Sequence, residues 1–112
     1  MEDDSAGRAP RLAGRARLTF WEKVTDDQGG ITEAIIWEVP KSAAYPEGLR
    51  YRLAYLPPGK DEPAVLYDVH PGKGHHRHIK GIEFPYEFLD VRQLRVDFEA
   101  DIKRVMMKGD RR

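Results

Sequence analysis

Residues 17–40 read RLTFWEKVTDDQGGITEAIIWEVP, and this stretch decides the fold class. Two apolar segments, residues 17–24 and 31–39, flank a polar turn that ends in two glycines, and glycine accepts the positive φ angles of tight turns. Successive strand residues point to opposite faces, so Ile35 and Trp37 share one face of the second segment. The stretch therefore predicts a hairpin of two long antiparallel strands.

The alternation of apolar and polar residues continues after the hairpin. Further strands are expected at residues 51–55, 64–70 and 75–80. A proline-rich turn at 57–63 and a glycine-containing turn at 71–74 separate them. The chain thus predicts about five short strands joined by turns, which is the pattern of an antiparallel meander.

The C-terminal part of the chain changes to helical periodicity. Asp90 is a favourable N-cap, and Gln93 three residues later matches the pattern of a capping box. Apolar residues then recur at helical spacing until Gly109, which fits a helix end. The apolar stripe consists of Val91, Leu94, Phe98, Ile102, Val105 and Met106. We therefore predict an α+β fold, an antiparallel β-meander of about five strands with one C-terminal helix packed on a face.

Length and composition fit one domain. The 112 residues are 40% hydrophobic and 34% charged, with 2 Trp, 5 Tyr and 4 Phe, which excludes a disordered chain. The absence of cysteine excludes disulfide scaffolds and thiolate zinc sites. No apolar run has the length of a membrane span or a secretory signal, so we expect a cytoplasmic protein without membrane contact. We expect a mobile basic tail at 1–16, a single domain at 17–107 and a basic end at 108–112.

The formal net charge of zero hides a local imbalance. Residues 18–101 hold 10 Lys and Arg against 15 Asp and Glu, whereas residues 69–82 contain no acid at all. All four histidines of the chain lie in that acid-free stretch, namely His70, His75, His76 and His78. The other basic residues of the stretch are Lys73, Arg77 and Lys80. This cluster is therefore the strongest sign of chemistry in the sequence.

His76 and His78 are separated by one residue, so on a strand their side chains share a face with Cα atoms about 6.6 Å apart. Two such imidazoles can flank a phosphorus atom, one taking the proton of a ribose 2′-hydroxyl and the other protonating the leaving 5′-oxygen. Histidine suits both roles because its ordinary pKa of about 6.5 lies near working pH. Lys73, Arg77 and Lys80 would bind the phosphate, although Arg77 faces the other way on a regular strand. The pattern predicts metal-independent RNA cleavage.

The same histidines allow a metal site as an alternative. His76 and His78 form a His-x-His pair on one strand face, and His70 can approach them across the hairpin. Asp68 or Glu83 would supply a carboxylate ligand. The basic surroundings oppose a divalent cation. A third interpretation is a solvated, histidine-rich turn without chemistry, or one that only docks nucleic acid or an acidic protein.

Other candidates lie near the histidine stretch. Asp68 follows Tyr67 on the strand that leads into it, where the carboxylate could orient an imidazole and Tyr67 could belong to the core. Tyr86, just after Pro85, could line the same cleft or serve the structure. Elsewhere, the hairpin tryptophans fit a packed aromatic set better than a base-stacking platform. Two strand arginines could extend a basic groove or merely solvate a sheet face, namely Arg50 and Arg52.

Several short motifs carry a resemblance through their order and spacing. They are IWEVP (36–40), YRLAY (51–55), YD (67–68), GKGHHRHI (72–79) and PYEF (85–88), followed by the C-terminal helix. Together they resemble the TumE family of small prokaryotic toxin-like proteins over about residues 17–107. The most distinctive part is the Lys-x-x-His-Arg-His stretch.

The resemblance implies the toxin of a type II toxin–antitoxin pair, a growth-inhibiting ribonuclease whose partner is an antitoxin of helix-turn-helix type. By motif match, the site residues carried over are Lys73, His76, Arg77 and His78, followed by Tyr67 and Asp68. The chain departs from the family pattern at two positions. His75 stands where the family tends to have an acidic residue, and Val69 stands where an asparagine often follows the Tyr-Asp pair.

We therefore expect an endoribonuclease toxin that uses no metal and no cofactor, with RNA as substrate and an antitoxin as partner. The expected catalytic residues are His76 and His78, and the expected phosphate- or RNA-binding residues are Lys73, Arg77 and Lys80. The expected supporting residues are Tyr67, Asp68, His75 and Tyr86. The alternatives left open are a non-catalytic module that docks through the histidine loop and a histidine-based metal site.

Overall fold

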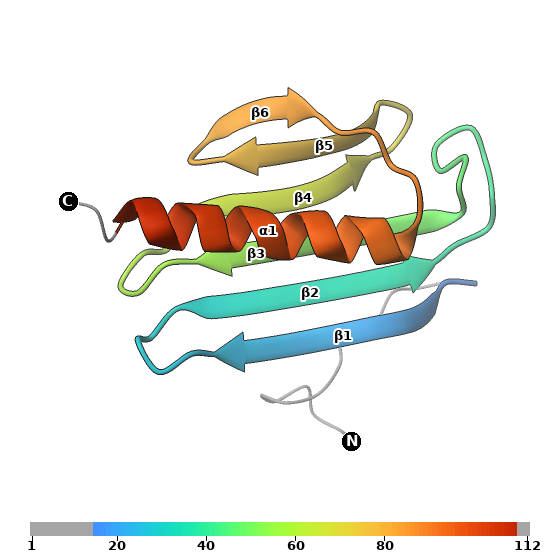
Figure 1. The fold of residues 1–112 in the computed structure, drawn as a ribbon. Helices are drawn as coiled ribbons and strands as arrows, with labels where there is room; N and C mark the ends of the chain where they lie inside the picture. Colours follow the sequence, from blue (N-terminus) through green and yellow to red (C-terminus); the bar gives the residue numbers. More distant parts are fainter. Residues whose placement is uncertain (1–14, 110–112) are drawn as a thin grey trace, which may run out of the picture.

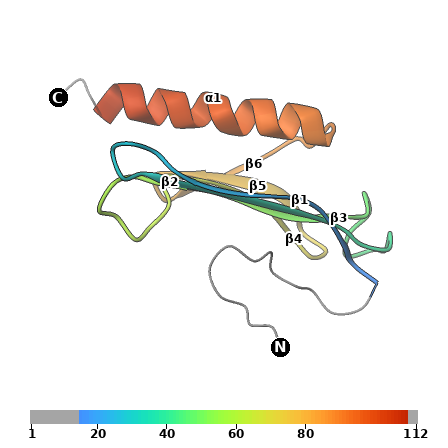
Figure 2. The same cartoon turned by 90° about the horizontal axis from the view of Figure 1, so that it is seen from below.

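Six strands follow one another in chain order across one antiparallel sheet, and a C-terminal helix lies over one face of it (Figures 1 and 2). The computed structural model describes residues 15–109. The elements are β1 (Arg17–Thr25), β2 (Ile31–Glu38), β3 (Leu49–Leu56), β4 (Val65–His70), β5 (Gly74–Ile79), β6 (Ile82–Pro85) and α1 (Val91–Gly109). The predicted α+β meander is confirmed, with β6 as a sixth strand. Residues 1–14 of the predicted tail and residues 110–112 of the predicted basic end lie outside the described residues.

The turn between β1 and β2 is fixed by one carboxylate. Asp26 Oδ1 accepts hydrogen bonds from the backbone N–H groups of Gln28 (2.9 Å) and Gly30 (2.8 Å). A Cβ added at Gly30 would lie 2.7 Å from the Asp26 carboxylate and 2.9 Å from the hydroxyl of Tyr55. Any larger residue at position 30 would require the Asp26 carboxylate or the Tyr55 ring to shift, which explains why the turn ends in glycine.

The core lies between the sheet and the helix. Leu94 and Phe98 of α1 are 0% and 3% exposed and pack on the inward residues of the central strands. Those inward residues are Ala34, Ile36, Tyr51, Leu53, Tyr55, Val65, Tyr67 and Val69. They alternate along β3 and β4, as a half-buried strand requires. We call this side the helix face, and the other side the open face.

The open face carries a row of paired residues that is apolar on β1 and β2 and polar on β3, β4 and β5. The backbone register pairs Trp21 with Ile35, Ile35 with Arg52, Arg52 with Asp68, and Asp68 with His76. Paired residues point to the same side of a sheet, so all five side chains lie on the face away from α1. Strand β2 is therefore apolar on both faces, because Ile35 and Trp37 lie here while Ala34 and Ile36 lie in the core. Trp37 is itself only 9% exposed.

Asp90 begins the helix as the sequence predicts. Its carboxylate accepts a hydrogen bond from the backbone N–H of Gln93 at 2.8 Å. The side chain of Gln93 does not complete a capping box and instead donates to Asp97 Oδ1 at 2.8 Å. Within residues 15–109, no helix is long and apolar enough to cross a membrane.

Candidate active site

The hairpin formed by β4 and β5 positions the histidine cluster. Its tight turn is closed by the backbone N–H of Lys73, which donates to the carbonyl of His70 at 3.0 Å. Asp68 pairs with His76, and Leu66 pairs with His78. His76 and His78 therefore share the open face, as their spacing predicts, and Asp68 and His70 of β4 join them there.

Asp68 lies at the centre of this open-face cluster. Its Oδ1 is 3.4 Å from Nε2 of His70 and 3.8 Å from Nε2 of His78. The rings of His70 and His76 meet edge to face with centroids 4.9 Å apart. On the far side of His76, its Nε2 lies 3.3 Å from Oε2 of Glu83 on β6. Three histidines and two carboxylates are thus gathered on one face within contact distance.

The cluster contains buried polar atoms that find no hydrogen-bond partner among the described residues. They are Asp68 Oδ1, His70 Nε2, His76 Nδ1 and His78 Nε2. Buried polar atoms in native proteins are normally paired, so unpaired atoms in one place are characteristic of a site that receives a ligand or substrate. The side chains themselves remain partly accessible, with 18% of His76 and 24% of His78 exposed.

Two arginines of β3 bring positive charge to the part of this face next to β4. Arg52 is the backbone partner of Asp68, and Arg50 lies two residues earlier on the same face. Both side chains are exposed. The sequence left their role open, and the register places them beside the histidines.

Arg77 points to the opposite face, as strand alternation predicts, and the structure does not bring it to His76 and His78. Its Nη1 donates hydrogen bonds to the hydroxyl of Tyr67 and to Asp101 Oδ2, both at 3.2 Å. Tyr67 also donates to Asp101, and so does Arg104. The hydrogen bond with Tyr67 raises the pKa of Arg77, while burial, together with the bond to Asp101, raises the pKa of Tyr67 well above its ordinary value.

Asp101 is the member of this network that sequence reasoning missed. It is 5% exposed and accepts from three donors on the helix face. A signal was present, because Asp101 lies seven residues after Leu94 and three after Phe98 and therefore on the apolar stripe of α1. An acid on such a stripe needs buried donors opposite it.

Two other expected supporting residues also serve the helix face. His75 stacks on Phe88 with centroids 4.7 Å apart, and its Nδ1 lies 2.7 Å from the hydroxyl of Tyr51. Tyr86 donates to Asp97 Oδ2 at 2.6 Å, and burial, followed by this bond, raises its pKa well above the ordinary value. The structure therefore brings neither residue to the open-face histidines.

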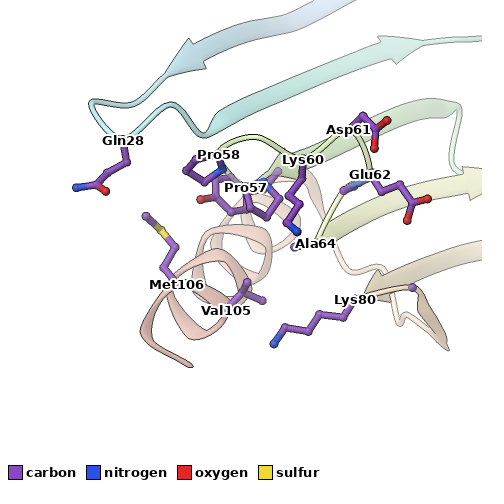
Figure 3. A pocket seen from close by; sticks show the side chains of 13 residues that line it. Gln28, Pro57, Pro58, Lys60, Asp61, Glu62, Ala64, Lys80, Val105 and Met106 are labelled. Carbon is purple, nitrogen blue, oxygen red and sulfur yellow. The ribbon is translucent and has the colours of Figure 1, made fainter. Parts of the chain in front are cut away.

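The two expected lysines lie at opposite ends of β5. Lys73 is exposed in the turn between β4 and β5. Lys80 follows β5 with a positive φ of 51° and lines a cleft of about 720 Å³ together with Pro57, Pro58 and Val105 (Figure 3). The expected phosphate-binding set is thus distributed over three places, and only the histidine pair remains together.

Comparison with known proteins supports the resemblance found in the sequence. The family model described as Toxin TumE matches residues 4–106. No curated protein and no solved structure gives a match. A toxin family of this kind implies an antitoxin partner in general terms. Since the match covers most of the chain, the protein belongs to the TumE toxin family.

Proposed function

We propose that this toxin belongs to a type II toxin–antitoxin pair and acts as a metal-independent endoribonuclease with His76 and His78 as its acid–base pair. The observation that carries the proposal is the placement of both imidazoles on one accessible face of β5, beside the carboxylate of Asp68. The face lies away from α1, so an extended single strand of RNA can lie across it (Figure 2).

The chemistry requires two proton transfers on either side of one phosphorus atom. One imidazole takes the proton of the ribose 2′-hydroxyl, and the 2′-oxygen attacks the adjacent phosphorus. The other imidazole gives a proton to the 5′-oxygen as its bond to phosphorus breaks. The products are a 2′,3′-cyclic phosphate and a free 5′-hydroxyl, and the two histidines finish with their protonation states exchanged.

Asp68 fits a positioning role in this scheme. Its Oδ1 lies 3.8 Å from Nε2 of His78, which is close enough for the carboxylate to orient the ring. Arg52, the backbone partner of Asp68, and Arg50 are the cations that β3 offers on this face for the phosphate backbone. In this scheme they take the phosphate-binding role that was expected for Arg77, whose guanidinium is hydrogen bonded on the helix face.

The RNA substrate is proposed from this surface, whereas the antitoxin and its helix-turn-helix type are implied by the family resemblance. RNA is the substrate, and the antitoxin, of helix-turn-helix type, silences the toxin by covering the open face. Recognition by such a partner would desolvate the histidines and exclude RNA in one step.

Cleavage of labelled RNA by untagged protein, with and without EDTA, tests the proposal. We expect cleavage that resists EDTA and that the His76→Ala/His78→Ala double variant lacks while it still binds RNA. His75→Gln is the matched control, because it removes a histidine of the same strand from the opposite face. Circular dichroism verifies that each variant is folded.

Three outcomes would contradict the proposal. Cleavage abolished by EDTA would make the metal essential, and cleavage retained by the folded double variant would place the chemistry elsewhere. RNA binding without cleavage by the wild-type protein would instead identify a docking module.

A further inference from the structure

We propose that Asp68, His70 and His76 form a binding site for a divalent transition-metal ion, and that the bound ion inhibits the toxin by occupying His76. The inhibition rests on the proposed function, whereas the binding site rests on geometry alone. One donor atom from each of the three residues lies within 4.8 Å of the donors of the other two.

The spacing of the first two ligands fits tetrahedral coordination. Zn²⁺ binds imidazole nitrogen and carboxylate oxygen at about 2.0–2.2 Å, so two ligands at a tetrahedral angle lie about 3.4 Å apart. Asp68 Oδ1 and His70 Nε2 are 3.4 Å apart. Both atoms are buried and lack a hydrogen-bond partner within the described part of the chain. They can therefore turn to an ion without losing an existing bond.

His76 has the environment of a metal-bound histidine. Its Nε2 lies 3.3 Å from Oε2 of Glu83, and its Nδ1 is buried without a hydrogen-bond partner among residues 15–109. Metal-ligating histidines commonly pass the N–H of one ring nitrogen to a carboxylate while the other nitrogen binds the ion. Glu83 would thus orient the ring. His78 lies beside the site, with its Nε2 3.8 Å from Oδ1 of Asp68, but it is not one of the three residues whose donor atoms converge.

The donor set selects the class of ion. Imidazole nitrogens favour Zn²⁺, Ni²⁺ and Cu²⁺, whereas Mg²⁺ and Ca²⁺ prefer oxygen ligands alone. The basic residues that seemed to oppose a cation are mostly elsewhere, because Arg77 lies on the helix face and Lys80 lies beyond the far end of β5. The carboxylates of Asp68 and Glu83 are in contact with the histidines. Arg52 is the one cation paired with the site through the backbone register.

Metal binding and acid–base catalysis compete for the same nitrogen atoms. An imidazole that donates a lone pair to an ion cannot use that lone pair to accept a proton. Occupancy of the site would therefore stop the metal-independent reaction. His70 is a ligand of the ion and has no part in the proposed proton transfers, so its removal separates the two properties.

Binding is tested with Co²⁺, whose visible absorption reports coordination independently of activity. We expect untagged wild-type protein and the His75→Gln control to bind one Co²⁺ per chain with the intense bands of a tetrahedral site. His70→Ala and Asp68→Asn should each weaken binding by at least about tenfold, and Glu83→Gln by about tenfold. Equal binding by wild type and His70→Ala, equal loss in His75→Gln, or no binding by the wild type would each overturn the site.

Inhibition is tested with Zn²⁺ in the RNA cleavage assay. We expect Zn²⁺ to inhibit the wild type and EDTA to restore it, while the cleavage measured for His70→Ala, relative to that variant's own rate without Zn²⁺, resists Zn²⁺. Equal inhibition of both proteins would overturn the regulatory role. If Co²⁺ binds as expected and no RNA is cleaved, the proposed function fails and the metal site stands. If RNA is cleaved without Co²⁺ binding, the metal site fails and the function stands.

Discussion

The two faces of the β4–β5 hairpin differ in how their polar side chains are satisfied. On the helix face, Tyr67 and His75 are hydrogen bonded, and Arg77 donates through Nη1, although its Nε is buried without a partner among the described residues. On the open face, His76 and Asp68 carry buried atoms without a partner among the described residues. The helix-face residues of β5 therefore contribute to stability, and its open-face residues form the candidate active site. Replacing two residues that are adjacent in the sequence should then affect different properties, namely the rate of cleavage for one and the free energy of unfolding for the other.

The largest effect is expected for the neighbouring pair His75 and His76. His76→Ala should lower the rate of RNA cleavage by about 10²–10⁴-fold, because an acid–base group is lost, and leave the free energy of unfolding nearly unchanged. His75→Gln should lower the free energy of unfolding by about 1–3 kcal/mol, because the hydroxyl of Tyr51 loses its partner. Single-turnover cleavage and urea denaturation measure the two quantities. If both variants lost the same cleavage rate and had the same free energy of unfolding, the two faces would not have different roles.

The next effect concerns stability alone. Asp101→Ala removes an acceptor shared by Tyr67, Arg77 and Arg104, and Asp101 is only 5% exposed. We expect the free energy of unfolding to fall by about 2–3 kcal/mol. The control Arg104→Ala should cost less than about 1 kcal/mol, since that side chain is 65% exposed. Equal costs in urea denaturation would show that burial of the network contributes nothing.

The free energy of unfolding should fall at alkaline pH because of a tyrosine on the helix face. Burial, and then the Asp97 carboxylate, raise the pKa of Tyr86, so the folded protein keeps this proton where the unfolded chain loses it, above about pH 10. The stability that this group contributes is complete below pH 10. It declines above pH 10, by up to about 1.4 kcal/mol per pH unit.

The variant Tyr86→Phe should make the alkaline decline shallower. Urea denaturation between pH 8 and about 11 checks the slope. Tyr45→Phe is the control, because this tyrosine lies in the β2–β3 connection. An unchanged slope in Tyr86→Phe would mean that its proton is not held by the folded state.

The smallest effect is expected for the arginines of the open face. Arg52→Gln should reduce the slope of RNA affinity against salt by about 0.7, the value for one contact with a single-stranded phosphate. Arg95→Gln is the control, because Arg95 belongs to α1 and lies 4.2 Å from the ring centroid of Phe20. Filter binding at several salt concentrations measures both slopes. If Arg95→Gln changed this slope more than Arg52→Gln did, RNA would bind on the helix face instead.

Local rules were sufficient for most of the fold. Period-two alternation and turn chemistry predict the hairpin, the central strands and the shared face of His76 and His78. Strand β6 was not predicted because it has only four residues, IEFP, and the alternation of Ile82, Glu83 and Phe84 is too short to distinguish a strand from an irregular segment. Short edge strands are fixed by backbone pairing with their neighbour, which the sequence of the strand does not reveal.

The candidate site was only half accessible to sequence reasoning. The alternation that groups His76 with His78 also removes Arg77 from them, and the sequence showed both consequences. The contact between Tyr67 and Asp101 depends on how α1 docks across β4, at a separation of 34 residues in the chain. No local pattern determines that docking. The position of Tyr86 depends on the same docking, through its bond to Asp97. The alternation of β5 already separates His75 from His76, and the sequence analysis did not apply it to His75.

The alternation of β5 also has a consequence for cells that escape the toxin. Substitutions at the even-numbered positions 76 and 78 should disarm the protein and leave its cellular abundance intact. Substitutions at the odd-numbered positions 75 and 77 should act by exposing the chain to proteolysis. Among cells that survive toxin expression, those with substitutions at positions 76 and 78 should therefore contain normal amounts of the protein. Those with substitutions at positions 75 and 77 should contain reduced amounts.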